Sequence, residues 1–63
     1  MEKLTLRAAR INKGLTMREA AEIVNISDRS IANYESGKRK PRIDTLIRLA
    51  NAYGMTLDQI KWE

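Results

Sequence analysis

Residues 16–37, TMREAAEIVNISDRSIANYESG, predict two short helices joined by a tight turn, and the other segments can be placed around them. Thr16 and Glu19 have the spacing of a capping box, in which the hydroxyl accepts from the backbone N–H of Glu19 and the carboxylate accepts from that of Thr16. A narrow apolar face follows at helical spacing, formed by Ala20, Ala21 and Val24. Because the two alanines let a second helix cross closely, we expect the first of the two helices over residues 17–24.

The turn and the second helix have sequence signals of their own. Asn25 tolerates the left-handed conformation in which a helix often ends, and Ser27 is a favoured cap for the helix that follows. In that helix, expected over residues 28–36, Ile31 and Tyr34 face inward, and Gly37 ends it. The outward face is formed by Asp28, Arg29, Ala32 and Asn33. This pattern predicts a helix-turn-helix, whose second helix can lie in the major groove of DNA.

The remaining segments predict further helices and no strand. Gly14 ends a first helix, and Pro41 makes residues 38–42 a loop because proline cannot continue a helix. A broad apolar stripe predicts a helix ended by Gly54, and it consists of Ile43, Leu46, Ile47, Leu49, Ala50 and Tyr53. Thr56 with Gln59 is a second capping-box pattern. We therefore expect an all-α fold, a compact five-helix bundle forming a single domain over residues 1–63, with helices at about 4–13, 17–24, 28–36, 43–53 and 57–61.

Composition narrows the classes of function. The chain has 63 residues without cysteine or histidine, so it lacks disulfides, a reactive thiolate and the usual zinc ligands. No apolar run is long enough for a signal peptide or a membrane span, and a cytoplasmic protein is expected. An enzyme is poorly supported, because no glycine-rich phosphate loop is present and Glu19, Glu22 and Glu35 have capping, surface or pairing roles. We expect no metal, no cofactor and no small-molecule substrate.

The formal net charge is +4, and four of the five residues from Lys38 to Arg42 are basic. Such a run is usually a solvated surface, but its place directly after the candidate recognition helix favours a loop that contacts phosphates. The backbone N–H of Met17, at the start of a helix, could also bind a phosphate. The full set of expected phosphate contacts is Thr16, Met17, Ser30, Ser36, Lys38, Arg39, Lys40 and Arg42.

The candidate base contacts lie on the outward face of residues 28–36. Arg29 can donate two hydrogen bonds to guanine, Asn33 can pair with adenine, and Ala32 can touch a thymine methyl group. Ser27, like Ser30, could bond either a base or a phosphate. Asp28 has three open roles: a cap that favours the helix dipole, an acceptor for a cytosine amino group, or a group that orients Arg29. Outside this motif, Arg29 and Asn33 would be read as ordinary exposed polar residues.

Several motifs together resemble a known family. They are KGLT at residues 13–16, Ala21 at the helix crossing, Ile31 in the recognition helix, YESGKRKP at 34–41 and IDTLIRLANAYGMTLDQI at 43–60. From about Leu4 to Lys61 the chain is similar to the phage repressor and Cro type of helix-turn-helix, also called the xenobiotic-response-element family. The resemblance implies a five-helix bundle that binds DNA and regulates transcription. It also implies a structural ion pair between Arg10 and Glu35, which would lock the first helix onto the end of the third.

The chain departs from the family pattern at four positions of the helix-turn-helix. Ala20 is smaller than the usual Leu, and Ile23 stands where the family is often charged. Met17 stands where the family usually has Gln, and its side chain cannot hydrogen-bond a phosphate with any strength. Asn25 stands where the turn usually has Gly, which is a mild change because Asn also tolerates the left-handed region.

Apolar residues near the C-terminus leave a question of assembly open. Trp62 either caps the core or contacts a second copy of the chain, since Trp is favoured at interfaces. The residues expected at such a dimer contact are Tyr53, Met55, Leu57 and Trp62. A two-fold homodimer would place two recognition helices about 34–36 Å apart and require a near-palindromic operator.

The sequence therefore favours a sequence-specific double-stranded DNA-binding transcriptional regulator, a repressor of phage or mobile-element type. The other hypothesis is a protein-interaction module, such as an antitoxin or a transcriptional coactivator, built on the same fold. The basic loop at residues 38–42 discriminates between them, because an interaction module has no need of cations facing a groove.

Overall fold

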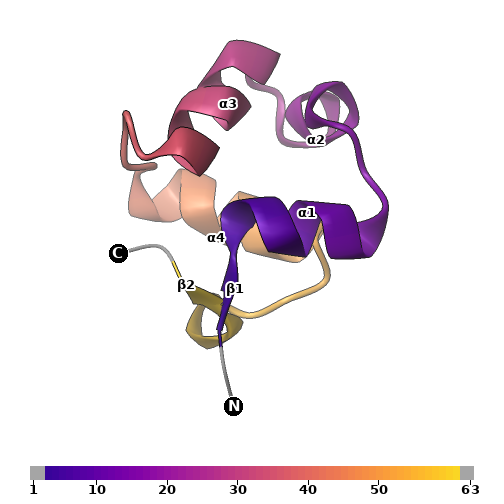
Figure 1. Ribbon diagram of the computed structural model, residues 1–63, viewed down its shortest axis with the longest axis vertical. Coiled ribbons are helices and arrows are strands. Elements are labelled where there is room, and N and C mark those ends of the chain that lie inside the picture. The colour runs from indigo at the N-terminus through magenta and orange to yellow at the C-terminus, as the bar shows by residue number, and fades with distance from the viewer. Residues whose placement is uncertain (1–2, 62–63) are drawn as a thin grey trace.

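The computed structural model describes residues 3–61, and within them it contains four α-helices, one 3-10 helix and one pair of short strands. In chain order these are β1 (Leu4–Thr5), α1 (Leu6–Lys13), α2 (Met17–Val24), α3 (Asp28–Ser36), α4 (Ile43–Ala52), the 3-10 helix η1 (Leu57–Gln59) and β2 (Ile60–Lys61). Figure 1 shows three tiers: α2 and α3 together at the top, α1 and α4 below them, and the strands with η1 at the bottom. The fold is predominantly helical, as predicted.

The helix-turn-helix forms over the predicted residues because its caps are local. Thr16 Oγ1 accepts from Glu19 N at 3.1 Å while Thr16 N donates to Glu19 Oε1 at 2.9 Å, which completes the capping box of α2. Asn25 ends α2 with φ of 60°, in the left-handed region that Asn adopts more readily than most residues. Ser27 then caps α3, and Gly37 ends it with φ of 83°.

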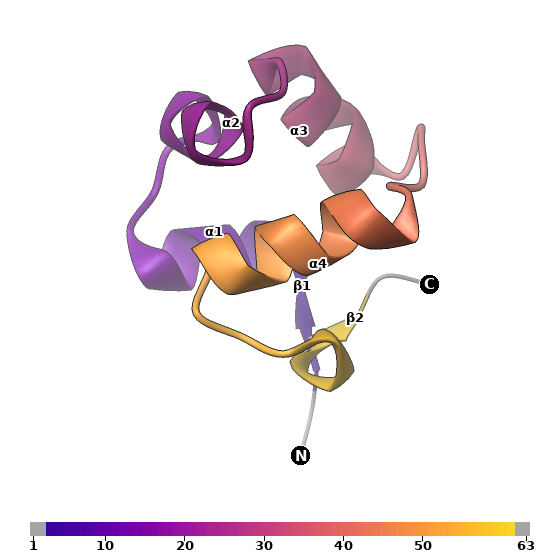
Figure 2. The same ribbon diagram turned by 180° about the vertical axis from the view of Figure 1, so that it is seen from behind.

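The core lies where the four α-helices meet. Its largest fully buried side chains are Ile31, Leu46, Leu49 and Ile60. Ala9 and Ala20 have no exposed surface, because methyl side chains let neighbouring helices approach closely. Figure 2, from behind, shows α4 crossing beneath α2 and α3, so α4 supports the helix-turn-helix from below.

The apolar stripe of α4 is narrower than predicted. Leu46, Leu49 and Ala50 are buried, and Tyr53, which caps the helix, joins them in the core. Ile43 and Ile47, predicted in the same stripe, are 57% and 42% exposed. They lie one helical turn apart and share the side of α4 that faces solvent.

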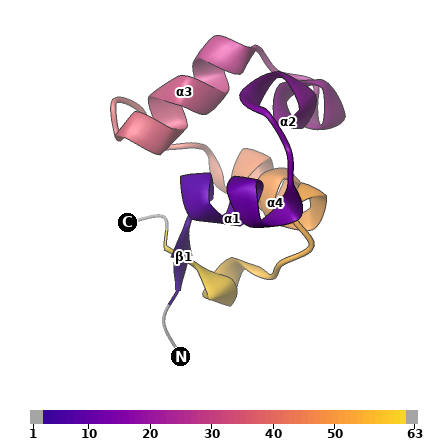
Figure 3. The ribbon, with the colours of Figure 1, turned by 45° about the vertical axis from the view of Figure 1, so that its right-hand side comes forward.

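Both ends of the chain differ from the prediction. The first helix begins at Leu6 rather than residue 4, because Leu4 and Thr5 pair in parallel with Ile60 and Lys61 (Figure 3). The fifth α-helix expected over residues 57–61 is replaced by a 3-10 turn followed by β2.

Local interactions determine the first part of this C-terminal segment, and long-range interactions determine the second part. Thr56 N donates to Gln59 Oε1 at 3.0 Å, so the predicted capping box forms and starts a turn. A single turn has too few backbone hydrogen bonds to propagate. Ile60 instead takes an extended conformation, which buries its side chain completely and pairs its backbone with β1.

Candidate nucleic-acid interface

The turn between α2 and α3 sets how the recognition helix α3 leaves the fold. After the left-handed Asn25, Ile26 N donates to Ala21 O at 3.0 Å, which closes the end of α2. Ile26 packs against the core, and Ser27 Oγ accepts from Ser30 N at 3.1 Å, which opens α3. The direction of α3 is therefore fixed within three residues of the end of α2.

Arg48 of α4 supports the same turn from outside it. Its Nη2 atom donates to Val24 O, in the last turn of α2, at 2.8 Å. Helix α2, all of which the structure describes, has no basic residue in its own last turn, so Arg48 supplies the cation that favours a helix C-terminus. We did not predict this role, because the two residues lie 24 positions apart and no sequence pattern joins them.

Arg10 and Glu35 tie the other end of α3 to α1. Arg10 Nε donates to Glu35 Oε2 at 2.7 Å and its Nη2 donates to Oε1 at 3.2 Å, a bidentate pair. Arg10 Nη1 also donates to Leu15 O at 2.8 Å, in the link between α1 and α2. The side chains are 10% and 5% exposed, and the hydrogen bond to Glu35 raises the pKa of Arg10.

The outward face of α3 is open to solvent near its start. Ser27, Asp28 and Arg29 are exposed, while Ala32 and Asn33 are half-buried. Of the nine residues of α3, all described, only Ile31 is buried. Asp28 lies in the first turn, where a carboxylate favours the helix dipole.

The two serines at the start of α3 are linked to each other. Ser27 Oγ and Ser30 Oγ lie 3.0 Å apart, at hydrogen-bonding distance. One hydroxyl hydrogen is used between them, so one remains for a base or a phosphate.

The loop after α3 carries exposed cations on an ordered backbone. Lys38 N and Arg39 N both donate to Asn33 O, at 3.0 Å and 3.3 Å. Ser36 Oγ donates to the same carbonyl at 3.3 Å, so its hydrogen is already engaged. The side chains of the loop that are both basic and exposed are Lys38, Arg39, Lys40 and Arg42.

The start of α2 offers fewer donors than the sequence suggests. The N–H of Thr16 is used by Glu19, but its hydroxyl accepts in the capping box and so keeps its own hydrogen. The hydrogen bond that the N–H of Thr16 donates to its carboxylate is the main cause of the lowered pKa of Glu19. Met17 is half-buried against the core, so a phosphate there would meet its backbone rather than its side chain.

These parts lie in order across one side of the molecule. In Figures 1 and 2, α2 lies on one side of α3 and the loop after α3 on the other. An exposed helix between two groups of cations and hydrogen-bond donors has the arrangement needed to span a major groove.

The residues predicted at a dimer contact have different surroundings. Tyr53 is buried in the core, and burial, reinforced by the negative charge of Glu35, raises its pKa to about 12. Met55 and Leu57 are half-buried and pack against the core edge. Trp62 lies outside the described residues.

Over residues 3–61 no helix has the length and apolar character to cross a membrane. The same residues contain no cluster of three or more His, Cys, Asp or Glu side chains suited to a metal ion.

A helix-turn-helix family model matches residues 6–60 of the chain. The chain is 42% identical over 55 residues to the HTH-type transcriptional regulator ImmR of Bacillus subtilis (strain 168), an alignment that covers 87% of this chain and 43% of ImmR. It is 38% identical over 55 residues to the uncharacterized HTH-type transcriptional regulator YobD of the same strain, covering 87% and 49%. To YonR, an SPbeta prophage-derived uncharacterized HTH-type transcriptional regulator of that strain, it is 32% identical over 53 residues, covering 84% and 49%. The chain thus spans about half the length of these curated relatives.

Proposed function

We propose that this chain, which belongs to the Cro/C1-type helix-turn-helix family, binds double-stranded DNA in a sequence-specific manner. We propose that it regulates transcription as a repressor of prophage type. The observation that carries this proposal is the exposed start of α3, held between the basic loop and the start of α2. The named relatives are transcriptional regulators, and one of them is prophage-derived.

In the proposed complex the first turns of α3 lie in the major groove. Arg29, which is exposed, donates to guanine O6 and N7. Asn33 contacts an adenine and Ala32 a thymine methyl group one turn further in. Ser27 uses the hydroxyl hydrogen left over from the serine pair, and Asp28 either serves the dipole of α3 or accepts from a cytosine amino group.

Phosphates on both sides of the groove hold this position. On one side we assign Lys38, Arg39, Lys40 and Arg42. The Ser36 hydroxyl donates to Asn33 O, so it would have to leave that bond to contact a phosphate. On the other side we assign the hydroxyl of Thr16 and the backbone N–H of Met17. Ser30 lies between the two groups, and it donates to a phosphate only where Ser27, rather than Ser30, is the donor of the serine pair. Contacts of this kind supply most of the sequence-independent affinity.

We further propose that two copies bind a near-palindromic operator, with half-sites about 34–36 Å apart. Met55 and Leu57, half-buried at the core edge, are the described residues available for that contact. The other function considered, an interaction module such as an antitoxin or coactivator, gains no support from the exposed cations of residues 38–42.

Selection of bound sequences from a random duplex pool tests the proposal, because it returns the preferred site, its symmetry and its half-site spacing together. On that site, Arg29→Ala should weaken binding by about 1–3 kcal/mol and relax the preference at one base pair. The matched control is Arg39→Ala, which should weaken binding to all duplexes equally and lower the salt dependence of the affinity. Equal losses on all sequences for Arg29→Ala would refute its role, and a wild-type chain that binds no duplex in dilute buffer would refute the function.

A further inference from the structure

Two isoleucines on the solvent side of α4 form an apolar patch that the DNA contacts proposed above do not use. Ile43 and Ile47 are 57% and 42% exposed, although both side chains are large and apolar. They lie four residues apart on one helix, so their side chains are neighbours, and we call them the α4 patch. Single exposed apolar residues are common on protein surfaces, whereas apolar side chains that adjoin one another are typical of contact surfaces.

The α4 patch lies at one end of the row of elements that the proposed complex places against DNA. Ile43 directly follows Arg42, the last cation of the basic loop, and that loop lies on the side of α3 away from α2 (Figures 1 and 2). Arg48 contacts the end of α2, and successive helical residues are rotated by about 100°, so Ile43 and Ile47 lie on the side of α4 turned away from α2. The row therefore ends in α2 on one side and in the patch on the other.

A second copy of this chain is the partner that the geometry of the proposed operator places at the end of this row. Recognition helices in adjacent major grooves are about 34–36 Å apart. The molecule measures 30 × 23 × 19 Å along its principal axes, so that spacing leaves a gap between facing edges that side chains can close. A two-fold axis brings identical edges together, so either the α2 edges meet or the patches meet. The exposed surface of α2 carries the charged Arg18, Glu19 and Glu22 beside a single isoleucine, which makes the patch the better edge for a contact between copies.

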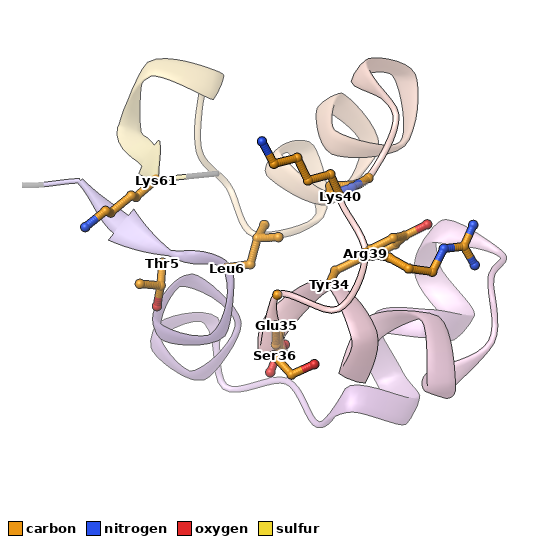
Figure 4. Close-up of a pocket in the computed structure, with 10 residues that line it drawn as sticks. Thr5, Leu6, Tyr34, Glu35, Ser36, Arg39, Lys40 and Lys61 are labelled. Atoms are coloured by element: carbon orange, nitrogen blue, oxygen red, sulfur yellow. The ribbon is translucent and has the colours of Figure 1, made fainter. Parts of the chain in front are cut away.

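The area and the charge around the patch indicate when this contact forms. A stable dimer buries about 800 Å² on each copy, about a sixth of the 4584 Å² that this chain exposes, and two isoleucines supply only a small part of that area. The contact also brings two basic loops close together. Figure 4 shows Arg39 and Lys40 leaving the loop in opposite directions, so the positive charge extends to both of its sides. In solution these cations repel those of the other copy, and DNA phosphates relieve the repulsion.

We infer that the α4 patch is the contact through which two copies bind the operator cooperatively, with the two isoleucines of one copy packed against those of the other. The free chain is monomeric, and DNA brings the patches together. This assignment rests on the proposed function, and it adds Ile43 and Ile47 to the residues of the contact between copies. Helix η1, which begins with the half-buried Leu57, contacts α4 and lies across it from α2 (Figure 2), so Leu57 belongs to the same side of α4 as the patch.

The test compares two double variants on the operator selected from the random pool. Ile43→Ser/Ile47→Ser removes the patch. The matched control, Ile11→Ser/Ile23→Ser, removes two isoleucines that are 55% and 57% exposed on α1 and α2. Serine has nearly the helix propensity of isoleucine, so both variants should keep the fold and show similar melting temperatures. Titration of the full operator and of a single half-site separates base recognition from the contact between copies.

We expect the patch variant to bind a half-site with wild-type affinity and to lose the cooperative binding of the second copy. Loss of that cooperativity should lower the affinity of the second copy for the full operator by about 5–150-fold, the usual range of coupling between two sites. The control variant should remain as cooperative as the wild type, because its isoleucines lie outside the contact.

A cross-linking measurement locates the two-fold axis independently of affinity. The chain has no cysteine, so Ile43→Cys or Ile47→Cys introduces one thiol per copy. A disulfide requires Cα atoms within about 7 Å of each other. Oxidation on operator DNA should therefore link two copies of at least one of these variants, and it should leave Ile23→Cys unlinked.

A patch variant as cooperative as the wild type, or a control variant that loses cooperativity equally, would overturn the inference and leave the proposed function intact. A wild type that fills the two half-sites independently would do the same. Cross-linking of Ile23→Cys in place of both patch variants would overturn the patch as the contact and assign it to the α2 edge. A wild type that binds no duplex would overturn the proposed function, and this inference with it.

Discussion

Replacing Arg10 with methionine should remove much of the stability of this small domain. The guanidinium donates to both oxygens of Glu35 and to the carbonyl of Leu15, so one side chain joins α1, the α1–α2 link and the end of α3. Methionine fills similar volume but donates nothing. It leaves Glu35, a carboxylate that is 5% exposed, without a partner in a place that water barely reaches.

The size of the effect follows from this burial. Breaking a buried ion pair on one side costs about 3–5 kcal/mol, and we take about 3 kcal/mol because the Arg10 side chain keeps 10% of its surface exposed. A domain of 63 residues has a total stability of roughly 3–9 kcal/mol. At about 4–8 °C per kcal/mol for a chain of this size, the melting temperature should fall by about 12–24 °C.

Circular dichroism at 222 nm, the ordinary wavelength for helix content, measures the melting temperature of Arg10→Met directly. The matched control is the double variant Arg10→Met/Glu35→Leu, which removes both charges. Because the loss comes from the orphaned carboxylate, the double variant should recover most of the stability. An unchanged melting temperature for the single variant, or additive losses in the double variant, would refute the reasoning.

Three further changes test other contacts. Tyr53 should lose its proton near pH 10 in the unfolded chain and near pH 12 in the folded chain. Its contribution to stability is therefore complete below pH 10 and declines by up to about 2–3 kcal/mol as the pH rises to 12. Urea unfolding at several pH values should show that Tyr53→Phe lacks this part of the decline and that Tyr34→Phe keeps it. Asn25→Ala should lower the free energy of unfolding by about 1 kcal/mol, because alanine is strained at φ of 60°, whereas Asn25→Gly should not lower it; a loss with glycine as large as with alanine would contradict this cause. Arg48→Ala should cost about 1 kcal/mol through the lost bond to Val24, and Arg48→Lys should restore part of it; equal melting temperatures for the wild type and Arg48→Ala would show that the bond contributes nothing.

The helix-turn-helix could be predicted from the sequence because its signals act over three or four residues. Thr16 with Glu19 sets the start of α2, Ser27 sets the start of α3, and Gly37 sets its end. Each of these residues satisfies backbone groups of its own helix, so the interaction is visible as a spacing along the chain. The exposure of Arg29 follows in turn, because once α3 is placed, helical geometry determines which side Ile31 faces.

The parts that could not be predicted depend on residues far apart in the chain. A strand of two residues has no periodicity, so the pairing of Leu4 with Ile60 leaves no pattern in either segment. The bond from Arg48 to Val24 likewise joins two elements that meet only after folding. For Ile43 and Ile47 a sequence pattern exists, but it did not predict their exposure. Their spacing fits a helix stripe, and the neighbouring helices are too few to cover its full width.

The contacts of α3 explain how one short helix can be both firmly held and free to contact DNA. Ile31 is buried and Tyr34 packs against the core, and the ends of the helix are fixed by the Ser27 cap and by the bond between Glu35 and Arg10. The exposed side chains of the outer face, such as Arg29, take no part in holding the helix in place. Recognition and stability therefore depend on different residues of the same nine-residue helix. A change on the outer face should alter the DNA sequence that is bound and leave unfolding almost untouched, whereas a change at Arg10 or Glu35 should weaken binding on every duplex in proportion to the fraction unfolded.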